Sequence, residues 1–146
     1  MTKVMIAGYF DPIHPGHLET FKFARLLAPD AHIIVVIHST EDIVKKSGFY
    51  IYEPHELGKL LIGFKDLIDE VLVSIDTDGT VTQTLKLIKP NIFVKGPDRT
   101  PENMPPSELE VCKAIGCQIV YQIGDKAGAS SKIKERIKAQ FNKLSK

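Results

Sequence analysis

Two histidines, His14 and His17, lie close together in the stretch Gly8-Tyr9-Phe10-Asp11-Pro12-Ile13-His14-Pro15-Gly16-His17. An apolar run precedes this stretch and apolar residues at helical spacing follow it, so we expect a strand-to-helix turn. Helix N-termini present N–H groups and a positive dipole end, and glycine allows close approach to the backbone. Two imidazoles there, partly or wholly protonated, could donate hydrogen bonds to a polyphosphate. The turn therefore predicts phosphoryl or nucleotidyl transfer, which needs mainly positioning and charge stabilisation.

Two other interpretations of this turn remain open. A single histidine after a strand is more often structural, although two histidines that flank one glycine favour a functional role. Asp11, His14 and His17 could also hold a metal, because carboxylate and imidazole groups are common metal ligands. No further Cys and His cluster occurs in the chain. We therefore predict no metal site built from protein ligands alone.

A second candidate anion site lies near the end of the chain, at Ser130-Ser131-Lys132. The apolar residues that follow recur on one helical stripe: Ile133, Ile137, Phe141 and Leu144. Ser130 or Ser131 is a natural N-cap for this helix. Hydroxyl and N–H groups at a helix start, with a lysine beside them, can also bind phosphate. Plain capping accounts for the serines equally well.

The rest of the chain alternates short apolar runs with segments of helical spacing, which is typical of a parallel sheet with crossover helices. We expect strands at Lys3–Ala7, His32–Ile37, Glu70–Ser74, Asn91–Lys95 and Gln118–Gln122. We expect helices at Leu18–Leu27, Val81–Leu87, Glu108–Ile115 and after Ser130. The pattern predicts a Rossmann-like, doubly wound five-stranded parallel sheet with helices on both faces, in a single α/β domain over residues 1–146. Such sheets bind ligands beyond the carboxyl ends of their strands.

Two expected loops border that edge. Residues 45–53 follow the second strand and bring Lys45 and Lys46, and residues 96–106 follow the fourth and bring Arg99. Loops at this edge commonly determine specificity in α/β domains. We interpret Arg99 as a group that holds an acceptor phosphate, with a surface ion pair to Glu102 as the alternative. His38, at another strand end, either lines the pocket or is structural.

Composition excludes several classes of protein. The 146 residues carry 19 positive and 18 negative side chains, a net charge of +1, and only three of the cations are arginines. This balance argues against nucleic acid as a partner. No apolar run is long enough for a membrane span, and no signal-peptide pattern occurs, so we expect a cytoplasmic protein. The spacing of Cys112 and Cys117 fits neither a redox nor a zinc motif, and we interpret both as reduced core thiols.

The stretch from Gly8 to His17 resembles the G-x-F-D-x-x-H-x-G-H signature of the nucleotidyltransferase superfamily that is named for its H-x-G-H motif. Residues 129–137 are similar to the S-T-T-K-I-K-x-x-I stretch of glycerol-3-phosphate cytidylyltransferases. Asp78-Gly79-Thr80-Val81 and Phe93-Val94-Lys95-Gly96-Pro97-Asp98 resemble runs of heptose phosphate adenylyltransferases. The resemblance covers the chain from end to end, in the family's order.

The resemblance implies a role for each site residue. The catalytic residues would be His14, His17 and Lys46. The nucleotide-binding residues would be Tyr9, Phe10, His14, Gly16, His17, Gly96, Asp98, Ser130, Ser131 and Lys132. The acceptor-binding residues would be Asp11, Lys45 and Arg99. CTP would donate CMP to a small phosphorylated alcohol or sugar, with Mg²⁺ bound to the triphosphate, in an enzyme that we expect to be a homodimer.

The sequence departs from the family pattern at three places. Tyr9 stands where members usually have Thr, and the family's arginine before the third strand falls near Gly58, beside Lys59. The arginine before the S-T-T stretch is also missing, with Lys126 the nearest cation. Lysine offers a point charge where arginine offers a planar fork. The missing arginines suggest one alternative, a nucleotide-binding regulatory module without turnover. The runs that resemble adenylyltransferases favour another, the transfer of AMP from ATP.

Overall fold

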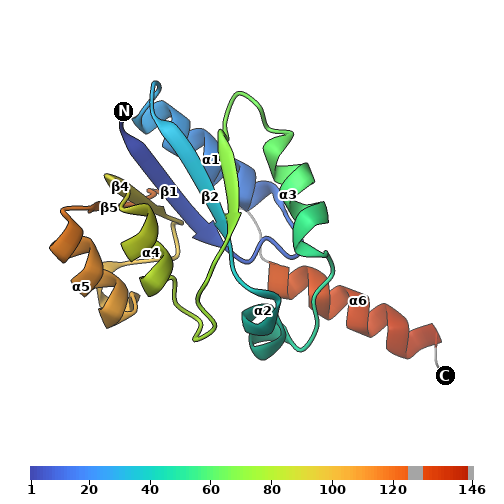
Figure 1. Cartoon of the computed structure of the whole chain (residues 1–146). Helices are drawn as coiled ribbons and strands as arrows, with labels where there is room; N and C mark the ends of the chain where they lie inside the picture. Colours follow the sequence, from blue (N-terminus) through green and yellow to red (C-terminus); the bar gives the residue numbers. More distant parts are fainter. Residues whose placement is uncertain (125–129, 145–146) are drawn as a thin grey trace.

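The computed structural model describes residues 1–124 and 130–144. Five parallel strands form one sheet in the order β3-β2-β1-β4-β5 (Figure 1). The strands are β1 (Lys3–Gly8), β2 (His32–Ile37), β3 (Glu70–Val73), β4 (Ile92–Lys95) and β5 (Gln118–Tyr121). Their ends differ by no more than one residue from those expected. The predicted doubly wound, Rossmann-like sheet in a single α/β domain is confirmed.

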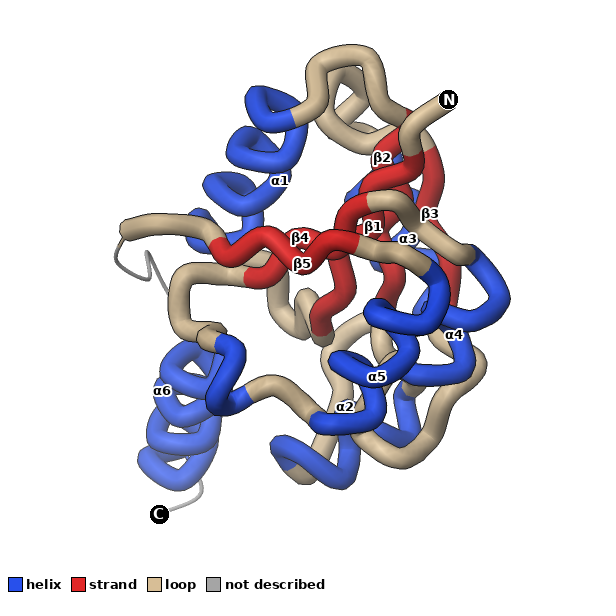
Figure 2. Tube along the Cα trace, turned by 90° about the vertical axis from the view of Figure 1, so that its left-hand side faces the viewer, coloured by secondary structure: helices blue, strands red, loops and turns tan. Residues whose placement is uncertain are grey.

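Six α-helices accompany the sheet in the described part of the chain. They are α1 (Pro15–Leu27), α2 (Thr40–Ser47), α3 (Pro54–Ile62), α4 (Thr82–Ile88), α5 (Pro106–Ile115) and α6 (Ser130–Leu144). Apolar residues of α1 and α3 cover one face of the sheet, and those of α4 and α5 cover the other. α2 and α6 lie beyond the carboxyl ends of the strands (Figures 1 and 2). No described helix is long and apolar enough to cross a membrane.

Successive residues of the central strands alternate between two apolar layers. Val4 and Ile6 of β1 belong to the layer of α1 and α3, whereas Met5 belongs to the layer of α4 and α5. Both faces of the strands are buried, which explains why these runs are almost continuously apolar in the sequence. Cys112 and Cys117 are buried in the second layer and form no disulfide. This confirms them as free core thiols.

The prediction of a loop over residues 45–53 is wrong in part, because Lys45 and Lys46 lie on α2. Ser39 caps this helix by accepting a hydrogen bond from the Asp42 N–H at 3.2 Å. Gly48, at φ +89°, ends the helix in the left-handed conformation that favours glycine. The helix is short and largely polar, so the sequence contains no apolar stripe that would predict it. The predicted loop over residues 96–106 holds a short 3₁₀ turn, Pro101–Asn103, and ends where α5 begins.

Candidate functional site

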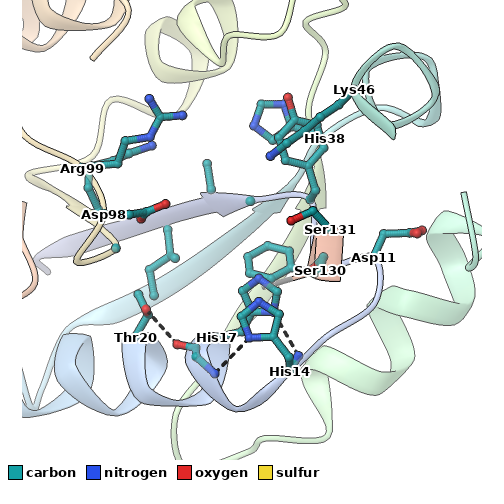
Figure 3. A pocket seen from close by; sticks show the side chains of 18 of the residues that line it. Asp11, His14, His17, Thr20, His38, Lys46, Asp98, Arg99, Ser130 and Ser131 are labelled. Atoms are coloured by element: carbon teal, nitrogen blue, oxygen red, sulfur yellow. Dashed lines mark hydrogen bonds between the residues drawn. The ribbon is translucent and has the colours of Figure 1, made fainter. Parts of the chain in front are cut away.

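A cavity of about 260 Å³ opens at the carboxyl edge of the sheet (Figure 3). The turn between β1 and α1 forms its floor, and the ends of β1 and β4 lie behind it. β2 lies on one side of β1 and β4 lies on the other, so the chain first extends the sheet in one direction and later in the opposite direction. The cavity therefore lies where the winding of the sheet reverses, which is the usual ligand position in open α/β sheets.

Most of the predicted site residues line this cavity. They are Tyr9, Phe10, Asp11, His14, Gly16, His17, Lys46, Gly96, Asp98, Arg99, Ser130 and Ser131. Lys45 and Lys132, predicted to bind acceptor and nucleotide, are not part of the lining. The Nζ of Lys45 donates to the Thr77 carbonyl at 2.8 Å, and Lys132 is exposed on α6. Lys126 lies outside the described residues.

The two histidine rings are stacked, with centroids 3.7 Å apart and planes 26° apart. The Gly16 N–H donates to Nδ1 of His14 at 3.0 Å, and the His14 N–H donates to Nδ1 of His17 at 3.1 Å. A ring nitrogen that accepts a hydrogen bond carries no proton, so these bonds assign the proton of each ring to Nε2. The two hydrogen bonds fix the orientation of both rings within the turn.

These bonds also change the predicted source of donors for an anion. The N–H groups of Gly16 and His17 are used within the turn, by Nδ1 and by the carbonyl of His14 respectively. The imidazole rings of the two histidines therefore form the part of this turn that lines the cavity. Both rings point into the cavity from below in Figure 3. Two adjacent N–H donors suit a pair of phosphate oxygens.

Phe10 supports this pair from behind. Its side chain is only 2% exposed, and its ring meets His17 edge to face, with centroids 4.8 Å apart. The backbone of Phe10 has φ +50°, which folds the ring back over Gly8. A Cβ at Gly8 would lie 2.8 Å from the Phe10 ring, so only glycine fits there. Phe10, predicted to contact nucleotide, also packs against a predicted catalytic ring.

The wall toward α2 combines aromatic rings with one lysine. Tyr9 and His38 are stacked at 4.2 Å, and Nζ of Lys46 lies 4.1 Å from the Tyr9 ring centroid. Burial lowers the pKa of His38 to about 4, against the opposing effect of Asp42, whose Oδ2 lies 3.6 Å from Nδ1. Burial raises the pKa of Tyr9. Near neutral pH both rings are uncharged, and Lys46 supplies the positive charge of this wall.

The opposite wall follows β4 and carries Lys95 and Arg99. Burial lowers the pKa of Lys95, while Glu108 opposes that effect. One guanidinium nitrogen of Arg99 donates to the Asn103 carbonyl at 2.9 Å, and Arg99 forms no ion pair with Glu102 within the described residues. Figure 3 shows Arg99 and Lys46 on opposite sides of the cavity. The site thus has cations on two walls, which is suitable for two phosphorylated ligands.

Asp11 does not present its carboxylate to the cavity as predicted for an acceptor-binding group. Its side chain is fully buried and accepts hydrogen bonds from the N–H groups of Ile51 at 2.9 Å and Tyr52 at 3.2 Å. It also forms an ion pair with Lys134 at 3.0 Å. The carboxylate oxygens are therefore already used by the protein. Binding of an acceptor by Asp11 would require the loss of these bonds.

Several polar residues of the cavity lining were missed in the sequence, and Thr20 and Lys134 are two of them. Thr20 lines the cavity, and its hydroxyl lies 3.1 Å from the Gly16 carbonyl and 2.7 Å from Oε1 of Gln122. Lys134 lies on the lining one helical turn after Ser130. Helical spacing could have found both, because residues three or four apart share a helix face. Ser130 itself donates to the Pro12 carbonyl at 2.7 Å.

The family-like run Asp78–Val81 is not part of the cavity lining. Its N–H groups are bound by buried carboxylates: Gly79 donates to Asp42, and Val81 donates to Glu108, both at 3.0 Å. These hydrogen bonds therefore connect α2 and α5 to the segment that leads into α4. The other half of the resemblance, which includes Gly96 and Asp98, does line the cavity.

The amino-acid sequence is similar to that of a known enzyme. A FAD synthase from Methanopyrus kandleri is 28% identical over 97 residues, which cover 66% of this chain and 63% of that protein. The chain therefore matches less than two thirds of the length of that relative.

Two solved structures share the fold. One is a lipopolysaccharide core biosynthesis protein from Thermoplasma volcanium, with a TM-score of 0.69 and 25% identity over 86% of this chain and 99% of that one. The other is a bifunctional NMN adenylyltransferase/ADP ribose pyrophosphatase from Francisella tularensis, with a TM-score of 0.58 and 13% identity over 93% of this chain and 41% of that one. Residues 5–136 match the family described as cytidylyltransferase-like, and the chain belongs to this family.

Proposed function

We propose that the protein is a nucleotidyltransferase that moves a nucleoside monophosphate from a nucleoside triphosphate to a small phosphorylated acceptor. The observation that carries this proposal is the stacked pair His14 and His17, which lines a cavity between two cationic walls. Membership of the cytidylyltransferase-like family supports the same class of reaction.

In this reaction a phosphate oxygen of the acceptor attacks the α-phosphorus of the triphosphate in line. A new P–O bond forms, the bond from the α-phosphorus to the bridging oxygen breaks, and pyrophosphate leaves with that bonding pair. The Nε2–H groups of the histidines stabilise the oxygens whose negative charge grows. Lys46 and Arg99 are placed to hold the phosphates from opposite sides. No proton transfer is needed in this step.

Mg²⁺ enters the proposal as part of the triphosphate substrate. Within the described residues, no group of three or more His, Cys, Asp or Glu side chains could hold a metal ion. The phosphates themselves would therefore supply most ligands of the ion. Bound in this way, Mg²⁺ neutralises charge on the leaving pyrophosphate.

The base of the donor has two candidates. The similarity of residues 129–137 to cytidylyltransferases favours CTP. The FAD synthase relative favours ATP, because the product in its name contains an adenine nucleotide. We propose both as donors to test, with glycerol 3-phosphate, a sugar phosphate and flavin mononucleotide as acceptors.

The test measures nucleotide binding by titration calorimetry and pyrophosphate release in parallel, with each donor and acceptor. We expect one triphosphate to bind more tightly than the other and to release pyrophosphate only when an acceptor is present. The double variant His14→Ala/His17→Ala is the matched control, which should bind nucleotide and release almost no pyrophosphate. Binding without turnover for every acceptor in wild-type protein would instead indicate a regulatory nucleotide-binding module.

A further inference from the structure

α6 contributes Ser130 and Ser131 to the cavity, yet most of its apolar stripe does not pack on the sheet. Ile137 is 45% exposed and Leu144 is 85% exposed. Figure 1 shows α6 projecting away from the body of the molecule toward the C-terminus. The burial of an apolar stripe, which normally fixes a surface helix, therefore explains little of the position of α6.

The one buried residue of α6 is a lysine. The Lys134 side chain is 6% exposed, and its Nζ lies 3.0 Å from Oδ1 of Asp11. The same nitrogen donates to Oγ of Ser47 at 2.7 Å and to the carbonyl of Phe49 at 3.0 Å. An ammonium group has three N–H donors, and here three oxygens are their partners. A buried charge so completely bonded fixes the direction of its helix.

These contacts join three separate segments at the cavity. Asp11 belongs to the turn that carries the histidines, and it also binds the N–H groups of Ile51 and Tyr52 in the connection from α2 to α3. Lys134 adds α6 to this pair. The buried ion pair thus connects the histidine turn, the segment that follows Lys46, and the helix that brings the two serines.

We propose that Lys134 is a positioning residue that holds the start of α6 against the histidine turn, so that Ser130 and Ser131 are in place before nucleotide binds. This inference rests on the proposed function, since it assigns the serines to the nucleotide. Without the ion pair, binding of nucleotide has to order the first turns of α6, and the free energy used for that ordering is lost from affinity.

The test compares wild type with Lys134→Met, with Asp11→Asn/Lys134→Met, and with Lys138→Met as the matched control. Lys138 lies one turn further along α6, is exposed, and has its Nζ 5.5 Å from the centroid of the Phe49 ring. Three quantities are measured: stability to urea, the Kd for ATP and CTP, and amide hydrogen exchange of residues 131–137 without nucleotide.

Lys134→Met leaves the buried carboxylate of Asp11 without its cation, so stability should fall strongly. The double variant removes both charges and keeps an acceptor oxygen for the Ile51 N–H, so most of the stability should return. In both variants we expect the Kd for nucleotide to rise at least tenfold and exchange in α6 to accelerate at least tenfold. Lys138→Met should match wild type in all three measurements.

A double variant that regains wild-type affinity together with stability would overturn the positioning role, because the pair would then only stabilise the fold. Unchanged exchange in α6 would overturn it as well. If wild-type protein binds neither nucleotide, the proposed function fails, and the exchange rates still decide whether Lys134 holds α6.

Discussion

The cavity is bounded by two regions that are fixed in different ways. The histidine turn, residues 8–17, grows out of the central strand β1, which pairs with a neighbour on each side. The serine turn, Ser130 and Ser131, begins a helix that projects from the molecule and is held by the buried Lys134 and by the hydrogen bond from Ser130 to the Pro12 carbonyl. The first region is positioned by a packed core, and the second by a few polar contacts.

This difference separates the tasks of the two regions. Groups that stabilise a transition state must be placed within fractions of an ångström before the reaction begins, and a central strand with buried neighbours provides that rigidity. A helix held by polar contacts can adjust with less cost as nucleotide enters and leaves. We therefore expect changes in the histidine turn to alter mainly rate, and changes that release α6 to alter mainly affinity.

The largest expected effect comes from the histidines. His14→Ala and His17→Ala should each lower kcat by roughly 10²–10³, because their hydrogen bonds strengthen mainly in the transition state. Nucleotide affinity should stay within a few fold of wild type. Steady-state kinetics and titration calorimetry measure the two quantities, with His55→Ala on the exposed side of α3 as a control. Near-normal turnover in either variant would remove the histidines from the mechanism.

A smaller effect, on stability, is expected at His38. Burial lowers its pKa from 6.5 to about 4, so the unfolded chain takes up a proton in this range while the folded protein does not. Stability is therefore lost as the pH falls from above 6.5 to 4, by up to about 3 kcal/mol. Urea unfolding at several pH values should show a smaller loss in His38→Gln. Equal losses in both proteins would show that another group causes the acid sensitivity.

The smallest effect is expected at the far end of α6. Leu144→Ser should change the free energy of unfolding by less than about 0.5 kcal/mol, because the side chain is 85% exposed. Thermal unfolding at two protein concentrations measures this. A larger loss that grows with concentration would show that the end of α6 is covered by a second copy, as the predicted homodimer allows.

The sequence predicts one region much better than the other, for physical reasons. The strands and the turn at Gly8–His17 follow from local signals: runs of Val and Ile, glycine, and a helix start. The Asp11–Lys134 pair joins residues more than a hundred positions apart, and no local pattern contains it. The predicted strand ends place Arg99 and Lys46 at the same edge of the sheet, but the paths of the loops decide whether the two side chains share one cavity.

The contact between Gly8 and Phe10 also has an evolutionary consequence. A methyl group at position 8 would collide with a ring that is itself enclosed, so Gly8→Ala is harmful as long as Phe10 is present. Replacement of Phe10 by a small residue would first open that space, but it would also remove the support behind His17. The two positions therefore constrain each other. Stepwise replacement of both residues has to pass through a protein in which His17 is poorly supported.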